Sequence, residues 1–403
     1  MKRLIAKSLT ARSLIAGASG LALLALALPA SAETFTLWVR SDGSTFMPKI
    51  VDAFNASQTE HKAELQIVPV GELVQKYAIA AAGQLEDLTE FAKGLPYFDA
   101  LSKAHLSVGT YDDKIYGVPF SADASVLIWN KKLFKQAGLD PEKAPTTWAE
   151  IQDDAAKVAA LGGETKGYYF SGNCGGCNIF TFTPLIWASG GDIFADNGKT
   201  ATLDTPQMRD AIAFYRGMVE QGLVPAGAQT DTGANFFAAF AGGNIGITPS
   251  GSFAIGALNS QYPDLDYGVT FLPGKDGGWS SFAGGDNFVV SKGTDKLPAI
   301  EAFLEFAYSL EGQTLLANNG SLPVRSDIAK DALKDLDPRY LIAAEAMAAG
   351  RTPFSTVFND LINSANGPWI TMLNAAFFGP ADGVDAAIAN GQSTMQSIID
   401  TAP

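Results

Sequence analysis

The alternation of strand and helix patterns from residue 33 onward constrains the fold of this chain most strongly. Residues 34–39 (TFTLWV) and 63–70 (AELQIVPV) are short runs rich in β-branched and aromatic residues, and amphipathic stretches at 41–57 and 72–82 follow them. Such alternation is typical of a sheet of parallel strands with helices on its faces. We therefore predict an α/β fold.

Later segments continue the pattern. Residues 146–161 predict a helix with Thr146 or Thr147 as N-cap and Glu150 completing a capping box. Further helices are predicted at 205–224, at 298–320 with Gly320 as the stop, and within the tail from 337, and strands at 267–274 and 287–291. The 403 residues favour about two domains. No repeat or low-complexity linker separates them, so ordered crossings must join the two.

The N-terminus has the three parts of a secretory signal peptide. Four basic residues precede an apolar run from Leu14 to Leu28, and Ala30-Ser31-Ala32 forms a cleavage site. The run of about 15 residues is shorter than the roughly 20 that a membrane-spanning helix needs. We predict that residues 1–32 are removed and that the mature chain, which is not inserted in a membrane, is exported to the periplasm.

Charge narrows the possible partners. The full chain carries 28 Lys and Arg against 42 Asp and Glu, a net charge of −14, and loss of the four basic signal residues makes it −18. An acidic chain is a poor partner for nucleic acid or for anionic membrane surfaces.

The only cysteines, Cys174 and Cys177, lie in the glycine-rich stretch FSGNCGGCNIF at 170–180. In an oxidising compartment two cysteines this close form a disulfide, which would fix the shape of the loop. A thiol oxidoreductase is the alternative, although Cys-x-x-Cys alone is a weak signal. A metal site is not predicted, because there is no second cysteine pair and His61 and His105 lack ligand spacing.

Four stretches in this order resemble a known family: KIYGVPFSADASVLIWNKKLFKQAGL, TPLIWASGGDIF, FAAFAGGNIGITPSGSFAI and AIEAFLEFAYSLEGQTLLANNGSLPVRSD. Together they resemble the extracellular solute-binding proteins of bacterial ABC importers, in the branch of maltose-binding-protein-like sugar binders. The resemblance implies a periplasmic-binding-protein type II-like fold, with two α/β lobes that close on a ligand by hinge bending. It also implies a monomer that works with a membrane permease and needs no cofactor.

By this resemblance, the first lobe comprises residues 33–120 and 283–330, and the second comprises 121–282 and 331–403. The crossings lie near 118–126, near 280–290 and after Leu322. The first lobe lacks a strand and helix that family members carry after the position of Gly83, which predicts unpaired backbone groups in its sheet.

Candidate ligand contacts come from the resemblance and from residue chemistry. Sugars offer hydroxyls to carboxylates and amides, and C–H faces to aromatic rings. The resemblance places Asp123 at a sugar-binding acidic position, Phe253 at a stacking position, and Arg40, Ser41 and Asp42 in a loop that contacts ligand, although this loop could simply cap the next helix. Asn173, Asn178 and Phe180 flank the cysteine loop, Asp286 follows a double glycine, and Trp279 lines the cleft or covers a turn.

Other aromatic and basic residues receive structural interpretations. Trp129, Trp148 and Trp187 are expected in the core, Trp369 lies near a family stacking position, and Arg325 is expected to support a loop.

We therefore predict a non-enzymatic protein that captures a carbohydrate or polyol. A polyamine binder would need several cleft carboxylates, and a binder of small acids would need an arginine such as Arg40. A glycosidase remains the enzyme alternative for a sugar-sized cleft, although no spacing selects a catalytic carboxylate pair.

Overall fold

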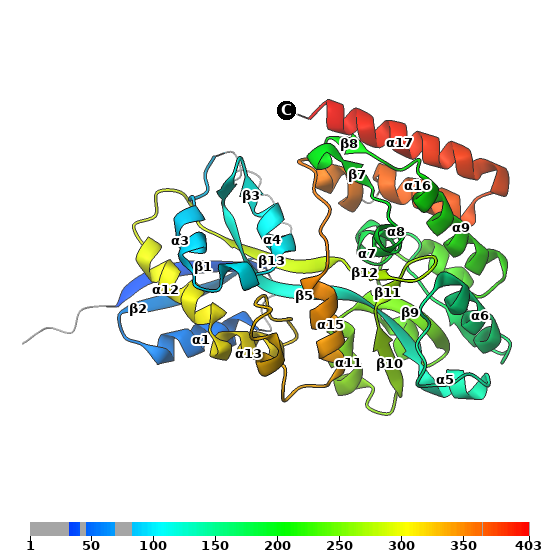
Figure 1. Ribbon diagram of the computed structural model, residues 1–403, viewed down its shortest axis with the longest axis horizontal. Coiled ribbons are helices and arrows are strands. Elements are labelled where there is room, and N and C mark those ends of the chain that lie inside the picture. Colours follow the sequence, from blue (N-terminus) through cyan, green and yellow to red (C-terminus); the bar gives the residue numbers. More distant parts are fainter. Residues whose placement is uncertain (1–31, 41–45, 69–82, 365, 403) are drawn as a thin grey trace, which may run out of the picture.

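The computed structural model describes residues 32–40, 46–68, 83–364 and 366–402. The predicted helix at 72–82, the predicted signal segment up to residue 31, Ser41 and Asp42 lie outside these ranges. Figure 1 shows two α/β bodies side by side, with the long strand β5 running from one into the other. Within the described residues no helix has the length and apolar character needed to cross a membrane.

The first body contains a parallel pair of strands, β1 (Glu33–Arg40) and β2 (His61–Val68), in the register Glu33↔His61 to Arg40↔Val68. Phe35 and Leu37 of β1 are buried on one face, as the period of two in a strand requires. Short strands β3 (Thr110–Tyr111) and β4 (Lys114–Ile115) form a hairpin nearby.

The second body is built on β5 (Gly117–Asn130), β6 (Lys166–Tyr168), β9 (Ile245–Gly251) and β10 (Tyr267–Thr270), in the spatial order β10-β5-β9-β6. β6 is parallel to β9, whereas β5 runs antiparallel to both β9 and β10. The parallel pairing predicted from the strands near residues 34–39 and 63–70 is confirmed for β1 and β2, whereas the sheet of the second body is mixed. The reason is that β5 enters from the first body and so runs against its neighbours. Two short antiparallel pairs lie outside this sheet. They are β7 (Phe194–Ala195) with β8 (Thr200–Ala201), and β11 (Leu272–Pro273) with β12 (Trp279–Ser280).

Three segments meet where the two bodies join. The first half of β5 pairs antiparallel with β13 (Ala283–Val289), from Gly117↔Val289 to Ala124↔Ala283. Leu322 forms an isolated bridge with Ala122 on β5, and its N–H donates to the Ala122 carbonyl over 2.7 Å. Of the segments expected to cross, those near 280–290 and at Leu322 therefore both pair with the one near 118–126, which is part of β5.

Helices cover both bodies (Figure 1). They are α1 (Met47–Ser57), α3 (Thr89–Gly94), α4 (Lys103–Val108), α5 (Lys131–Gln136), α6 (Trp148–Ala159), α7 (Gly175–Thr181), α8 (Thr183–Ala188), α9 (Pro206–Glu220), α10 (Ala238–Ala241), α11 (Phe253–Gln261), α12 (Leu297–Tyr308), α13 (Leu310–Asn318), α14 (Ala329–Ala332), α15 (Arg339–Ala348), α16 (Pro368–Phe378) and α17 (Val384–Asp400).

Local capping explains where two of these helices begin. Thr147 is the N-cap of α6 and its hydroxyl accepts from the Glu150 N–H, as predicted, while the Glu150 carboxylate reaches back to the N–H of Thr146. The single helix predicted at 298–320 is instead two helices, α12 and α13. Ser309 separates them, because its extended backbone ends α12 and its hydroxyl caps α13 through the Gly312 N–H.

Candidate functional site

Asp123 lies in the middle of the crossing strand β5, where its backbone pairs with Gly284 of β13. Its Oδ1 accepts the N–H groups of Ala124 at 2.8 Å and Ser252 at 2.9 Å, and also the Ser252 hydroxyl. Burial raises the pKa of this carboxyl, while the hydrogen bonds from Ser252 and Ala124 oppose that rise. Asp123 is thus a desolvated acceptor held in one orientation by backbone donors.

Aromatic rings lie next to both strands that flank Asp123. A Cβ on Gly251 of β9 would overlap the Phe253 ring and would lie 2.9 Å from Asp123 Oδ2. A Cβ on Gly284 of β13 would lie 3.1 Å from the Phe180 ring. The two glycines therefore leave room for aromatic side chains beside the carboxylate. Phe253 is 40% exposed, which is unusual for a large apolar side chain.

An ion pair joins β1 to the crossing. Arg40 Nη2 lies 2.9 Å from Asp286 Oδ1, and both side chains are 38% exposed. The other carboxylate oxygen of Asp286 accepts from the Ser121 hydroxyl of β5 over 2.9 Å. Arg40 and Asp286 were both predicted as ligand contacts, and the structure brings them together on the first-body side of the crossing.

His105 of α4 is buried against the same strands. Its Nδ1 lies 2.7 Å from the Ser102 hydroxyl, and its carbonyl accepts from the Asn287 amide of β13 over 2.8 Å. Burial lowers the pKa of the imidazole, and the nearby Asp286 charge and the backbone of Gly284 and Ser121 oppose this shift.

We expect the free energy of unfolding to fall as the pH drops below about 6.5, the usual histidine pKa. The lowered pKa of His105 means that the unfolded chain takes up a proton first, so this contribution is complete above that pH and is lost as the pH falls through the folded-state pKa. Urea unfolding between pH 5 and 7.5 measures the slope, which for one proton is at most about 1.4 kcal/mol per pH unit. His105→Gln should remove it, whereas Ser102→Ala, which keeps the titrating ring, should not. An unchanged slope in His105→Gln would contradict the assignment.

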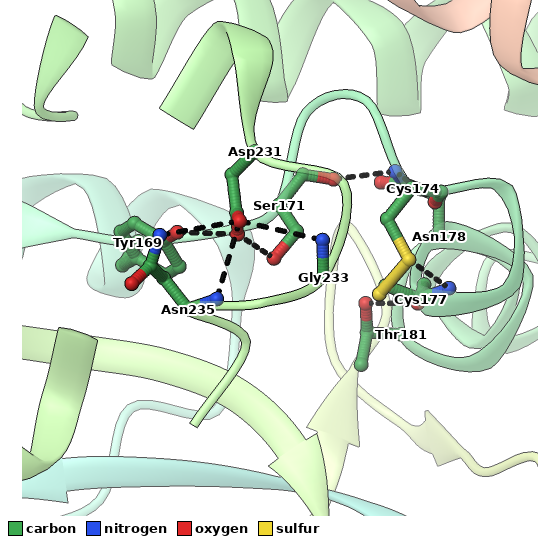
Figure 2. The surroundings of a disulfide bond; sticks show 9 residues. All are labelled: Tyr169, Ser171, Cys174, Cys177, Asn178, Thr181, Asp231, Gly233 and Asn235. Carbon is green, nitrogen blue, oxygen red and sulfur yellow. Dashed lines mark hydrogen bonds between the residues drawn. A yellow bond between two sulfur atoms is a disulfide. The ribbon is translucent and has the colours of Figure 1, made fainter. Parts of the chain in front are cut away.

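The cysteine pair forms the predicted disulfide, with Cα atoms 5.2 Å apart, at the start of α7 (Figure 2). The Cys177 N–H donates to Cys174 Sγ over 3.0 Å, and the Asn178 amide donates to the carbonyls of Ser171 and Cys174, each at 2.8 Å. Asn178 is buried and its amide holds the loop, so its side chain faces the loop carbonyls and not a ligand. Asn173, in the same loop, donates its N–H to the Asp231 carbonyl.

The remaining predicted residues are two proposed ligand contacts, Phe180 and Trp279, and the residues given a structural interpretation. Phe180 is half-buried, packs against Phe282 with ring centroids 5.3 Å apart, and its carbonyl accepts from the Ser125 hydroxyl of β5. Trp279 stacks on Phe271 at 4.1 Å and covers the β11–β12 hairpin. The three tryptophans expected in the core are buried there: Trp129, Trp148 and Trp187. Trp369 is also buried, so its ring offers no surface on which a sugar could stack. Arg325 supports its loop as expected, through Asp327 and the Tyr308 carbonyl.

Asp231 and Phe236 were not predicted as site residues, whereas Ser252, beside Gly251, was expected to offer its backbone N–H, which Asp123 accepts. Asp231 has local partners in Gly233 and Asn235, but its contacts with Tyr169 and Ser171, and that of Phe236 with Phe253, join parts of the chain that local pattern does not connect. Within the described ranges, no three His, Cys, Asp or Glu side chains group as a metal site.

Comparisons with known proteins agree with this architecture. Residues 38–314 match the family model described as bacterial extracellular solute-binding protein. A binding protein of Brucella abortus (strain 2308) is 26% identical over 337 residues, which cover 77% of this chain and 81% of the relative. The sn-glycerol-3-phosphate-binding periplasmic protein UgpB of Escherichia coli (strain K12) is 30% identical over 212 residues, or 49% of this chain and 47% of UgpB.

Two solved structures have the same fold. The sugar-binding protein MalE from Xanthomonas citri has a TM-score of 0.79 at 18% identity, covering 91% of this chain and 98% of its own. The cyclic alpha-maltosyl-1,6-maltose binding protein from Arthrobacter globiformis has a TM-score of 0.77 at 23% identity, covering 92% and 100%. The fold is that of MalE-like periplasmic binding proteins. The chain belongs to the bacterial extracellular solute-binding protein family.

Proposed function

We propose that this protein is the periplasmic substrate-binding component of an ABC importer, and that it captures an uncharged carbohydrate or polyol for delivery to a membrane permease. The observation that carries the proposal is the oriented, partly buried carboxylate of Asp123 beside the rings of Phe253 and Phe180. A carboxylate accepts hydroxyl protons, and aromatic faces cover the C–H face of a sugar ring. Micromolar capture corresponds to about −8 kcal/mol, which a few such contacts can supply.

The ligand would bind between two lobes, residues 33–120 with 283–330 and residues 121–282 with 331–403. Asp123 lies close to the proposed boundary on β5, so closing the lobes would surround it. Bending at β5 and β13 would provide that motion.

The charges around the crossing favour an uncharged ligand over the phosphate ester suggested by the name of UgpB. Arg40 already pairs with Asp286, and Arg351 pairs with Asp192. Asp123 adds a carboxylate that would repel a phosphate or a small acid. A polyamine is the second candidate, because its ammonium groups would pair with the carboxylates of Asp123 and Asp286. It is the weaker one, because Arg40 already neutralises Asp286.

Thermal melts of the mature chain, residues 33–403, test the proposal. The panel contains maltose, mannobiose, tagatose, a polyamine and sn-glycerol-3-phosphate. A sugar at about 100 times its dissociation constant should stabilise the protein by roughly 2.7 kcal/mol and raise the melting midpoint. We expect sugars to do so and sn-glycerol-3-phosphate not to. A cooperative melt that moves only with sn-glycerol-3-phosphate or with the polyamine would overturn the assignment to uncharged carbohydrate.

A further inference from the structure

Phe236 extends the aromatic surface beside Asp123. Its ring centroid lies 6.1 Å from that of Phe253, with the two planes inclined by 39°. The adjacent Phe237 turns the other way, packing against the hydrophobic core and against Tyr262. Phe253 therefore lies near Asp123, with the space left by Gly251 between them, and also next to Phe236.

The loop that carries Phe236 is anchored at Asp231. One carboxylate oxygen of Asp231 accepts from the Tyr169 hydroxyl at 2.6 Å and from the Ser171 hydroxyl at 2.5 Å. The other accepts from the N–H groups of Gly233 at 3.3 Å and Asn235 at 3.2 Å and from the Asn235 amide (Figure 2). Burial alone would raise the pKa of Asp231, but the hydrogen bonds, with those of Ser171 and Tyr169 largest, lower it, so the acceptor stays ionised.

The disulfide packs directly against this loop. Gly233 has a φ of +109°, and a Cβ added to it would lie 3.1 Å from the Sγ atoms of both Cys174 and Cys177. The loop carbonyl of Gly233 in turn accepts from the Phe236 N–H over 3.2 Å. The disulfide, Gly233 and Phe236 thus form a continuous support, since glycine allows both the backbone conformation and the close approach.

We propose that Phe236 is a specificity-determining residue that stacks on the second sugar ring of the ligand, and that the Cys174–Cys177 disulfide positions it. The inference rests on the proposed function, because it extends the same site. Phe253 next to Asp123 would cover the ring that the carboxylate binds, and Phe236 would cover the next one. The substrate class is therefore a disaccharide or longer oligosaccharide, in which only the units beyond the first depend on Phe236.

The first test compares Phe236→Ala with Phe237→Ala, using maltose and mannobiose against glucose and mannose in titration calorimetry. We expect Phe236→Ala to lower the affinity for the disaccharides about tenfold, or about 1.4 kcal/mol. The affinity for the monosaccharides and the melting midpoint should stay unchanged. Phe237→Ala should lower the midpoint, because its ring packs in the core, and should leave the disaccharide affinity intact. Equal disaccharide affinity in wild type and Phe236→Ala would overturn the role of Phe236 while leaving sugar capture in place.

The second test concerns the disulfide as a positioning element. Serine can replace Cys174 and Cys177 and still cap α7. Gly233→Ala perturbs the support from the loop side, and its control is Gly227→Ala, where an added Cβ meets nothing within 4 Å. We expect the serine double variant and Gly233→Ala to lower the affinity for disaccharides as Phe236→Ala does. Gly227→Ala should leave that affinity unchanged.

A double-mutant cycle separates positioning from general destabilisation. If the disulfide acts through Phe236, the variant that combines the two serine changes with Phe236→Ala should have the same maltose affinity as Phe236→Ala alone. Additive losses would overturn the positioning role. A wild-type protein that binds none of the four sugars would overturn the proposed function itself, and with it the assignment of Phe236.

Discussion

Asp123→Asn should lower sugar affinity by about 10- to 100-fold without lowering the melting midpoint. All three hydrogen bonds from Ala124 and Ser252 go to Oδ1, which an asparagine amide can reproduce with its carbonyl oxygen. The lost feature is the charge on an acceptor facing ligand hydroxyls, and hydrogen bonds to charged groups contribute about 1.5–3 kcal/mol. Titration calorimetry with the sugar that shifts the wild-type melt most measures the affinity.

A second variant, Asp123→Ala, separates this effect from a loss of structure. Asp123→Ala removes the acceptor of the Ala124 N–H and of the Ser252 hydroxyl, while the Ser252 N–H keeps its second acceptor, the Ala124 carbonyl, at 2.9 Å. Each buried donor left without an acceptor costs about 1–3 kcal/mol. This variant should therefore lose stability as well as affinity. Wild-type affinity in Asp123→Asn would rule out Asp123 as a charged ligand contact.

The pH dependence of stability offers an independent check on the same residue. Because burial raises the pKa of Asp123 in the folded protein, the native state holds its proton to higher pH than the unfolded chain. This contribution to stability is complete below about pH 3.9, the ordinary carboxyl value, and is lost as the pH rises through the folded pKa. The difference in unfolding free energy between Asp123→Asn and wild type should grow across that range in favour of the variant.

The parts of this fold that the sequence predicted are those that depend on local pattern. The α6 cap needs only Thr147 and Glu150, and the disulfide needs only two cysteines three residues apart. The direction of β5 could not be predicted in this way, because it depends on which body supplies its neighbours. The break at Ser309 was missed because the apolar spacing continues on both sides of it, although serine is a favoured N-cap.

The candidate site shows the same division. Asp123 and Phe253 lie in recognisable stretches, whereas Asp231 contacts Tyr169 and Ser171 across about 60 residues of chain. Asn178 looked like a ligand contact because of its position beside the cysteines, yet its amide satisfies two loop carbonyls. A glycine-rich loop leaves such carbonyls unpaired unless a nearby amide reaches them, and only the folded geometry shows which one does.

Gly285→Ala should destabilise the protein far more than the comparable change at Gly277. Gly285 lies in β13 with a φ of +127°, and an added Cβ would overlap the Ser121 carbonyl oxygen and lie 2.7 Å from Ala122 Cα. Gly277 has a φ of +110° in the β11–β12 hairpin, and a Cβ there meets nothing within 4 Å. Both variants carry the backbone strain of about 1–3 kcal/mol, but only Gly285→Ala adds overlap with backbone, which costs a further 1–3 kcal/mol or so.

Urea unfolding of the two variants measures that difference directly, and equal losses would show that β13 can move away from β5 without cost. We expect that β13 cannot move in this way, because the register of the two strands shifts between Asp286 and Asn287, one residue beyond Gly285. Such an irregularity re-aims the side chains beside it. One of these is Asp286, which lies between Gly285 and the shift and pairs with Arg40 and Ser121. Gly285 is therefore required by the crossing on which the proposed lobe closure depends, and it lies next to Asp286, the partner of Arg40.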